Sequence, residues 1–214
     1  MVGMKLYVEG GGDAKLLRTA CRQGFSEFLK KAGLVGYMPR LVACGSRKAA
    51  YDAFCTAQSN GESAMLLVDS EDPINAQFQQ PTDDPSKWRP WQHLLNRQGD
   101  QWPKPVGAND DHCHFMVQCM ETWFIADRET LRIFFDPGFK GSVLPSVGNN
   151  VELATKQQVY QSLVDATKDC KTKASYNKGE HSFKLLALIN PAKVTAASSW
   201  AKRFVNEMKK QMGC

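Results

Sequence analysis

Three carboxylates follow two short apolar runs of the sequence. Glu9 comes directly after residues 6–8, and Asp69 and Glu71 follow residues 64–68. Because desolvating an unpaired carboxylate is costly, a buried strand is expected to end on acids only where something offsets their charge. Side chains at i and i+2 leave a strand on the same side, which places Asp69 and Glu71 together. The three acids therefore predict a cup for a hard cation, Mg²⁺ or Mn²⁺.

The N-terminal part of the chain alternates between strand and helix patterns. This order is typical of a parallel sheet with right-handed crossovers, so the predicted fold class is α/β. Functional groups of such sheets gather beyond the carboxyl ends of the strands, where all three acids lie. The predicted elements are strands over residues 6–8, 40–44 and 64–68, a helix over 16–32 with Asp13 as N-cap, and a helix over 47–58.

A long irregular segment, residues 73–111, interrupts this pattern. Its six prolines forbid long helices and central strands, and the only helix predicted in it is short, over residues 91–97. Trp88, Trp91 and Trp102 also lie here. They could stack nucleic-acid bases, but we expect them to pack the segment onto the core.

The remainder of the chain adds one strand and a helical tail. Residues 112–119 predict a fourth strand, which runs into a helix beginning at Met120. We therefore expect one α/β domain over residues 1–135, insertion included, and a mainly helical extension over 136–214 packed on it. Further helices are predicted over residues 128–135, 156–168, 183–189 and 198–212.

Other charged residues are candidates for the same chemistry. Glu121 lies at a strand-to-helix junction and could be a ligand, a helix-start acid or a partner of Arg128. Asp72 precedes a proline and could equally be a ligand or a turn acid. Basic residues of the tail form either a solvated face or a nucleic-acid surface, with Lys184, Lys202 and Arg203 as its contacts.

Composition limits the alternatives. The net charge of +5 combines an acidic middle with basic ends, which suits a cation site beside surfaces that attract a polyanion. Seven cysteines without a CxxC pair indicate reduced thiols in a cytoplasmic protein. No secretory signal is recognisable, and no apolar run approaches the ~20 residues of a membrane span.

Three other kinds of site find no support in the sequence. The glycines after Glu9 fit neither the P-loop pattern nor GxGxxG. His112 and His114 would share one face of a strand with Cys113 on the other, which argues against a structural zinc site. No GxSxG motif is present, so no nucleophilic triad can be assigned.

The acid motifs carry a family resemblance. Val8-Glu9-Gly10, followed by Asp13 and by a strand ending in Asp69-x-Glu71, resembles the toprim domain of topoisomerases, primases and overcoming-lysogenization-defect nucleases. In that family the first glutamate serves acid/base or metal chemistry and an Asp-x-Asp pair binds Mg²⁺. Here a glutamate replaces the second aspartate, so either Glu71 or Asp72 would supply that ligand.

A narrower resemblance covers nearly the whole chain. Residues 121–126, Glu-Thr-Trp-Phe-Ile-Ala, and residues 176–178, Tyr-Asn-Lys, are similar to blocks of a bacterial toprim-like family, domain of unknown function family 4276. Members of that family often lie beside genes for ABC-type or SMC-like ATPases. The resemblance thus implies such an ATPase as partner and a role in defence against phage or other foreign DNA.

Together these observations predict a Mg²⁺- or Mn²⁺-dependent nuclease. Glu9 would be general base or shared ligand, Asp69 and Glu71 would hold the metal, and Glu121 would assist. The resemblance implies that Lys178 lies near the metal, where it could stabilise charge that develops on a phosphate. Two alternatives stay open. One is a phosphoryl-transfer enzyme acting on small nucleotides, and the other is a non-catalytic module that docks on an ATPase.

Overall fold

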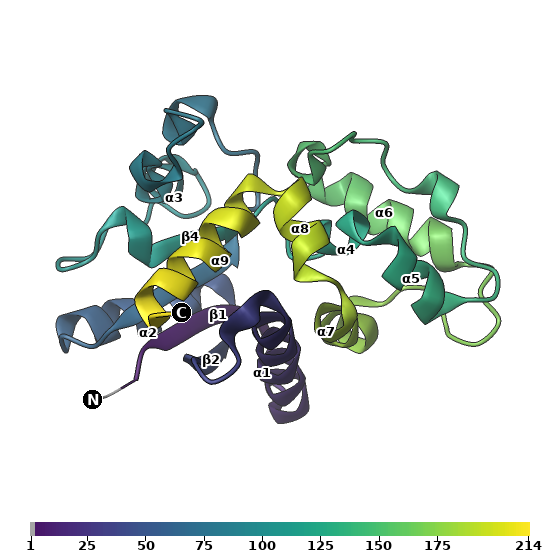
Figure 1. The fold of residues 1–214 in the computed structure, drawn as a ribbon, viewed down its shortest axis with the longest axis horizontal. Helices are drawn as coiled ribbons and strands as arrows, with labels where there is room; N and C mark the ends of the chain where they lie inside the picture. Colours follow the sequence, from purple (N-terminus) through teal and green to yellow (C-terminus); the bar gives the residue numbers. More distant parts are fainter. Residues whose placement is uncertain (1–2) are drawn as a thin grey trace.

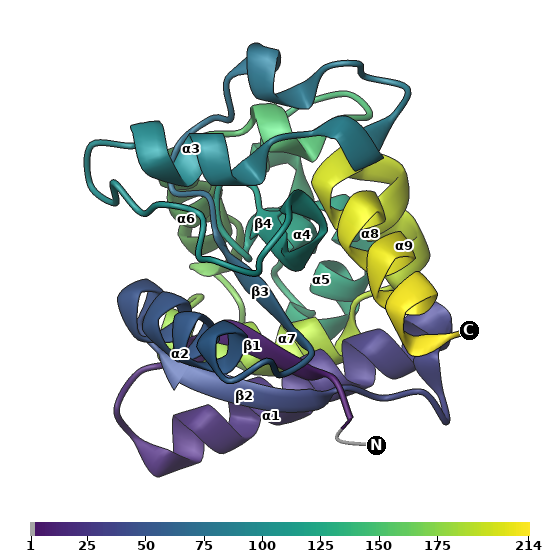
Figure 2. The ribbon, with the colours of Figure 1, turned by 90° about the vertical axis from the view of Figure 1, so that its left-hand side faces the viewer.

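Four parallel strands form the centre of the molecule. A computed structural model describes residues 3–214, and its sheet has the strand order β2-β1-β3-β4 (Figures 1 and 2). All three neighbouring pairs run parallel, which confirms the predicted α/β class and the number of strands. The strands are β1 (Lys5–Gly11), β2 (Arg40–Gly45), β3 (Ala64–Asp69) and β4 (Cys113–Met116).

The two faces of the sheet carry separate apolar cores. Alternate residues of a strand point to opposite faces, so Leu6 and Val8 join one core while Tyr7 joins the other. Helix α1 (Lys15–Leu29), which continues as a π-helical segment over Lys30–Leu34, covers the first face. Helix α2 (Arg47–Ser59) covers the second, on the opposite side of the sheet (Figure 2).

The proline-rich insertion packs onto the α2 side. Trp88, Trp91 and Trp102 are all buried in that core, which confirms that they anchor the segment. The Trp102 ring stacks on Tyr51 of α2 with 4.7 Å between centroids. These indoles are therefore not free to stack on bases. The insertion contains the 3₁₀ turns η2 (Ala76–Gln79), η3 (Pro85–Lys87) and η4 (Asp110–His112), and helix α3 (Pro90–Asn96).

The C-terminal helices share the core of the α1 face. Apolar residues from β1, α1 and the tail belong to one continuous cluster. Helix α7 lies along α1, and α9 crosses β4 (Figure 1). The elements after β4 are α4 (Thr122–Ala126), α5 (Arg128–Phe135), η5 (Gly141–Val143), η6 (Val151–Leu153), α6 (Lys156–Thr167), α7 (Lys178–Leu188), α8 (Pro191–Ala197) and α9 (Ser199–Met212).

Several predicted boundaries are wrong. The residue that precedes α1 as its N-cap is Ala14, whereas Asp13 is exposed and lies 3.4 Å from Arg18. The fourth strand stops at Met116 instead of residue 119, and α7 begins at Lys178, five residues earlier than expected. Both shifts bear on the site, because the backbone after Met116 and the start of α7 contribute to it.

Two further findings concern the chain as a whole. All seven cysteines are free thiols. Within residues 3–214, none of the helices has both the length and the apolar character needed to cross a bilayer.

Candidate functional site

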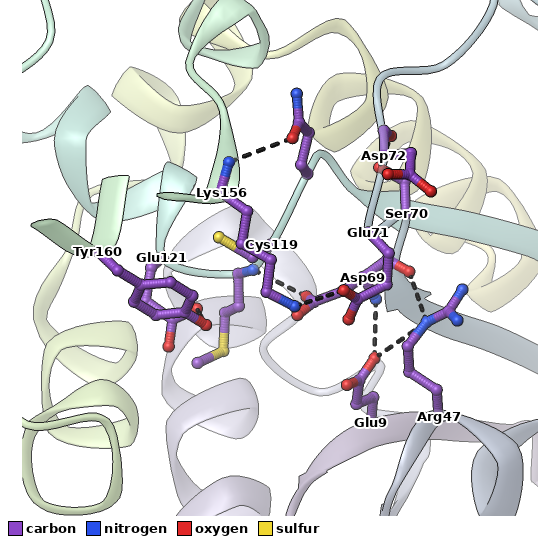
Figure 3. Close-up of polar contacts among 12 residues, drawn as sticks. Glu9, Arg47, Asp69, Ser70, Glu71, Asp72, Cys119, Glu121, Lys156 and Tyr160 are labelled. Carbon is purple, nitrogen blue, oxygen red and sulfur yellow. Dashed lines mark hydrogen bonds and ion pairs between the residues drawn. The ribbon is translucent and has the colours of Figure 1, made fainter. Parts of the chain in front are cut away.

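Glu9, Asp69 and Glu71 meet at the carboxyl end of the sheet. Each offers a carboxylate oxygen, and these oxygens lie within 4.8 Å of one another. The parallel register pairs Val8 of β1 with Leu67 of β3, and Val8 is the last residue of β1 in that pairing. Glu9 is the next residue, so it lies level with the end of β3. Figure 3 shows the three side chains pointing toward one another. We call them the acid triad.

The backbone beyond β3 sets the direction of Glu71. The amide of Ser70 donates to the Met116 carbonyl at 3.1 Å, and the amide of Glu71 donates to the Gln118 carbonyl at 2.9 Å. Glu71 has a φ of +66°, a left-handed conformation that residues other than glycine seldom adopt. Strand alternation therefore does not explain its position, because β3 ends at Asp69. The left-handed turn brings its carboxylate into the triad.

Each triad member keeps one carboxylate oxygen open. Asp69 Oδ1 accepts a hydrogen bond from the Met120 amide at 2.8 Å, and Glu9 Oε2 accepts from the Asp69 amide at 3.0 Å. Glu71 Oε2 pairs with Lys156 Nζ at 2.6 Å. No donor of residues 3–214 hydrogen-bonds the second oxygen of any of the three. The triad thus has three hard oxygen donors to offer a cation, the donor type that Mg²⁺ and Mn²⁺ take.

Two basic side chains lie against two of the three acids and leave Asp69 without an ion-pair partner in the described chain. Arg47 lies 3.6 Å from Glu9, but its guanidinium makes a bidentate pair with buried Asp100 and donates to the Asp69 carbonyl at 2.9 Å. Lys156 is committed to Glu71. Within the described chain, Asp69 has no ion-pair partner at 4.0 Å or less. Negative charge therefore remains at the centre of the triad.

Burial of these acids shifts their protonation. Desolvation raises the pKa of Glu9 to about 6, against the opposing effects of the Asp69 amide and of Arg47. Desolvation likewise raises the pKa of Asp69, and repulsion from Glu9 and Glu121 acts in the same direction. Such shifts mark an anionic site whose charge costs free energy in the absence of a counter-ion. A divalent cation would remove that cost.

Glu121 is not a member of the triad. It is fully buried, and its carboxylate accepts hydrogen bonds from the hydroxyls of Tyr160 (3.0 Å), Tyr176 (3.1 Å) and Ser182 (3.0 Å). Lys178 Nζ lies 3.8 Å away and donates to the Tyr160 hydroxyl at 2.8 Å. Glu121 therefore has a supporting role, because its carboxylate and the Tyr160 hydroxyl hold Lys178 near the triad.

Lys178 keeps its charge there. Burial alone would lower the pKa of its ammonium group, but Glu121, Asp69 and Glu9 outweigh that effect and raise it. The hydroxyl partners that complete this network lie on α6, on α7 and just before α7. The sequence marked only Tyr176, in the Tyr-Asn-Lys block of the family resemblance; no motif marked Tyr160 or Ser182, because such residues in a helical tail have many possible roles.

Asp72 and the histidines lie outside the triad. Asp72 Oδ2 pairs with Arg97 Nε at 2.7 Å, as a turn acid on the insertion side would. His114 is fully buried, with Nε2 at 2.9 Å from the Asp111 carbonyl, and burial holds its pKa well below the usual range. His112 Nδ1 accepts from the Asn109 amide at 3.3 Å. Neither histidine is placed to meet a metal with Cys113.

The predicted nucleic-acid contacts divide into exposed and buried residues. Lys184 and Lys202 are exposed on α7 and α9. Arg203 is only 5% exposed, and its guanidinium donates to the carbonyls of Pro85 and Cys113 at 2.9 Å each. The expectation of Arg203 on an open basic face is therefore wrong, because α9 turns that side chain toward β4 and the insertion.

A cavity of about 240 Å³ opens beside the triad. Glu9 and Asp69 form one side of it, and Lys178 and Gly179 at the start of α7 form another. Among the residues that the structure describes, the other side chains around it are apolar: Leu17, Met116, Met120 and Phe183. The site thus combines open carboxylates, a fixed ammonium group and an apolar hollow.

Comparison of the sequence with known proteins assigns the chain to a family. A search of curated proteins returned no match, and neither did a search of solved structures. A family model described as "Domain of unknown function (DUF4276)" matches residues 8–209, a span that includes the triad and Lys178. This match confirms the family named in the narrower resemblance, and it does not extend to the toprim similarity. The chain belongs to the DUF4276 family of domains of unknown function.

Proposed function

We propose that this protein is a divalent-metal-dependent phosphodiesterase that hydrolyses nucleic acid. The observation that carries the proposal is the convergence of Glu9, Asp69 and Glu71, with one open oxygen each, beside a cavity that Lys178 also lines. The similarity of Glu9 and of the Asp69-x-Glu71 pair to toprim motifs supports the same reaction. Mg²⁺ or Mn²⁺ is the proposed cofactor, because hard cations prefer oxygen ligands.

The residues of the site fit that cofactor, and each would have a separate role in the reaction. Asp69 and Glu71 would hold the metal, which supplies Lewis-acid activation of a phosphoryl oxygen. Glu9, whose pKa of about 6 lies near neutrality, would take the proton of the attacking water. Lys178 would stabilise the negative charge that develops on the phosphate, with Glu121 and Tyr160 fixing its position.

The direct test is a digestion series. Labelled DNA, labelled RNA and free nucleotides are incubated with the purified protein and Mn²⁺ or Mg²⁺, with EDTA as the control. We expect cleavage of a nucleic acid that EDTA abolishes. Calorimetry without substrate should show binding of Mn²⁺. Absence of both metal binding and cleavage would leave a non-catalytic docking module as the better description.

The pH dependence of metal binding is a second test. The metal binds ionised carboxylates, so protonation of Glu9 competes with it as the pH falls through about 6. Each pH unit below that value should cost at least about tenfold in Mn²⁺ affinity, because the pKa of Asp69 is raised as well; tenfold is equivalent to about 1.4 kcal/mol of metal-dependent stability. In the metal-free protein the sign is opposite: a raised pKa in the folded state lets Glu9 add stability as the pH drops below about 6.

Thermal unfolding with and without Mn²⁺ between pH 5 and 8 measures both effects. We expect a large metal-dependent rise in the unfolding midpoint that stays constant from pH 8 down to about pH 6 and shrinks below it. Asp13→Asn is the matched control, because Asp13 is a fully exposed carboxylate near the same turn. A metal-dependent rise of equal size at every pH would contradict the assignment of Glu9.

The cellular role follows from the family resemblance alone. On that basis we propose that the protein works in the cytoplasm with an ABC-type or SMC-like ATPase, in defence against phage or other foreign DNA. Lys184 and Lys202, both exposed, remain the candidate nucleic-acid contacts. Co-purification of a neighbouring ATPase from cells that express a tagged copy would test the partnership.

A further inference from the structure

The cavity beside the acid triad is unusual for a site that handles phosphate alone. A phosphate group needs cations and hydrogen-bond donors, and Lys178 with the metal would supply those at one side. The other side chains of the cavity wall are apolar, those of Leu17, Met116, Met120 and Phe183, and the backbone of five glycines completes it: Gly10, Gly11, Gly12, Gly45 and Gly179. The four apolar side chains offer nothing to a phosphate, so the part of the hollow that they line suits an apolar part of the substrate.

The position of the hollow fixes which part that is. Glu9 and Asp69 line both the triad and the cavity. A substrate whose phosphate lies at the triad would therefore place the group attached to that phosphate in the apolar space. In a nucleic acid that group is a sugar carrying a base. Aromatic rings and thioethers are good surfaces for a base, because base–aromatic stacking and sulfur–aromatic contacts are both favourable.

We infer that the cavity binds the sugar and base of one unpaired nucleotide. This inference rests on the proposed function and deepens it by naming the substrate class. A volume of about 240 Å³ lies below the roughly 300–1,000 Å³ of typical ligand pockets, so the cavity has room for no more than one nucleoside and none for a base pair. Bases inside a duplex are stacked and paired, so a base must leave the helix to enter such a pocket.

The walls also predict how selective the pocket is. Apart from Glu9, Asp69 and Lys178, which face the phosphate side, no lining side chain among the described residues carries a hydrogen-bonding group. A pocket of this kind recognises the face of a base by stacking and not its Watson–Crick edge. The four nucleotides should therefore bind with affinities that differ by only a few-fold.

Neighbouring leucines of α1 provide a matched pair of variants. Leu17 lines the cavity, whereas Leu16 is 84% exposed. Leu17→Trp fills the hollow, and Leu16→Trp adds the same ring on the surface. The probes are thymidine monophosphate and deoxyribose phosphate, in which a hydroxyl replaces the base, titrated by calorimetry into the Mn²⁺-loaded protein. A Mn²⁺ titration without either probe shows whether the triad is intact.

We expect thymidine monophosphate to bind at least about tenfold more tightly than deoxyribose phosphate. Leu17→Trp should abolish that difference and leave Mn²⁺ binding unchanged, and Leu16→Trp should change neither. Should Leu17→Trp fail to fold, Phe183→Leu removes the ring at similar volume and should reduce the difference several-fold. Equal binding of the two probes to a protein that binds Mn²⁺ would overturn the pocket but not the proposed function.

Displacement of labelled thymidine monophosphate identifies the source of the nucleotide. A single-stranded oligonucleotide that displaces it points to a strand, and displacement by free nucleotides alone points to a small-molecule substrate. In either case a closed duplex circle should displace it at least tenfold less well. Equally good displacement by the closed duplex would overturn the inference. Loss of Mn²⁺ binding itself would instead count against the proposed function.

Discussion

Replacing Glu9 by glutamine should reduce metal-dependent cleavage about 10³-fold without unfolding the protein. Loss of a general base typically costs 10²- to 10⁴-fold in rate, and Glu9 also contributes an oxygen to the acid triad. The glutamine oxygen can still accept the hydrogen bond that the Asp69 amide donates to Glu9. Cleavage of the best substrate from the digestion series, measured in single turnover with saturating Mn²⁺, provides the rate.

Stability measurements separate this chemical role from a structural one. Burial raises the pKa of Glu9, so its charge costs free energy in the metal-free fold, and a neutral glutamine should leave the unfolding midpoint equal or higher. Asp13→Asn removes a carboxylate four residues away that is fully exposed, and should leave both rate and midpoint unchanged. A Glu9→Gln protein that is strongly destabilised, or that cleaves at the normal rate, would refute the assignment.

The same residue illustrates what the sequence could predict. An apolar run that ends on an acid is a local pattern, and parallel topology brings the ends of such runs together. Glu9 and Asp69 were therefore predictable from two short segments 60 residues apart. Glu71 was reached by an argument about strand alternation that the fold does not use, because its carboxylate is aimed by a left-handed turn.

The surroundings of the triad could not be predicted in this way. Arg47 is held by Asp100, and Lys178 is held through Glu121 and Tyr160, each contact joining segments far apart in the chain. Such contacts depend on how the insertion and the tail pack, which neither periodicity nor spacing encodes. The fold class was recoverable because it follows from repeated local signals, whereas the apolar cavity depends on the packing of α1, β4 and α7.

The prediction for Arg203 was wrong because the sequence gives the charge of a residue but not its burial. The helix α9 carries several basic residues, and the sequence alone does not distinguish one that faces solvent from one that faces the core. The structure places the Arg203 guanidinium against three backbone carbonyls, those of Pro85, Asp110 and Cys113. One side chain thus joins α9, β4 and two turns of the insertion.

Arg203→Ala should therefore destabilise the protein by about 3–5 kcal/mol. The substitution leaves buried carbonyls without donors and removes a cation that lies within 3.4 Å of Asp111. Arg203→Lys should recover only part of this loss, because an ammonium group cannot replace the planar fork of donors. Urea denaturation gives the free energies of unfolding.

The adjacent residue supplies the control that decides between a structural and a nucleic-acid role. Lys202 is exposed, so Lys202→Ala should change the free energy of unfolding by less than about 0.5 kcal/mol. If Lys202 contacts nucleic acid, the same variant should weaken DNA binding and reduce its salt dependence. An Arg203→Ala protein of normal stability that binds DNA poorly would instead mean that the guanidinium faces the substrate, which its five hydrogen-bond contacts argue against.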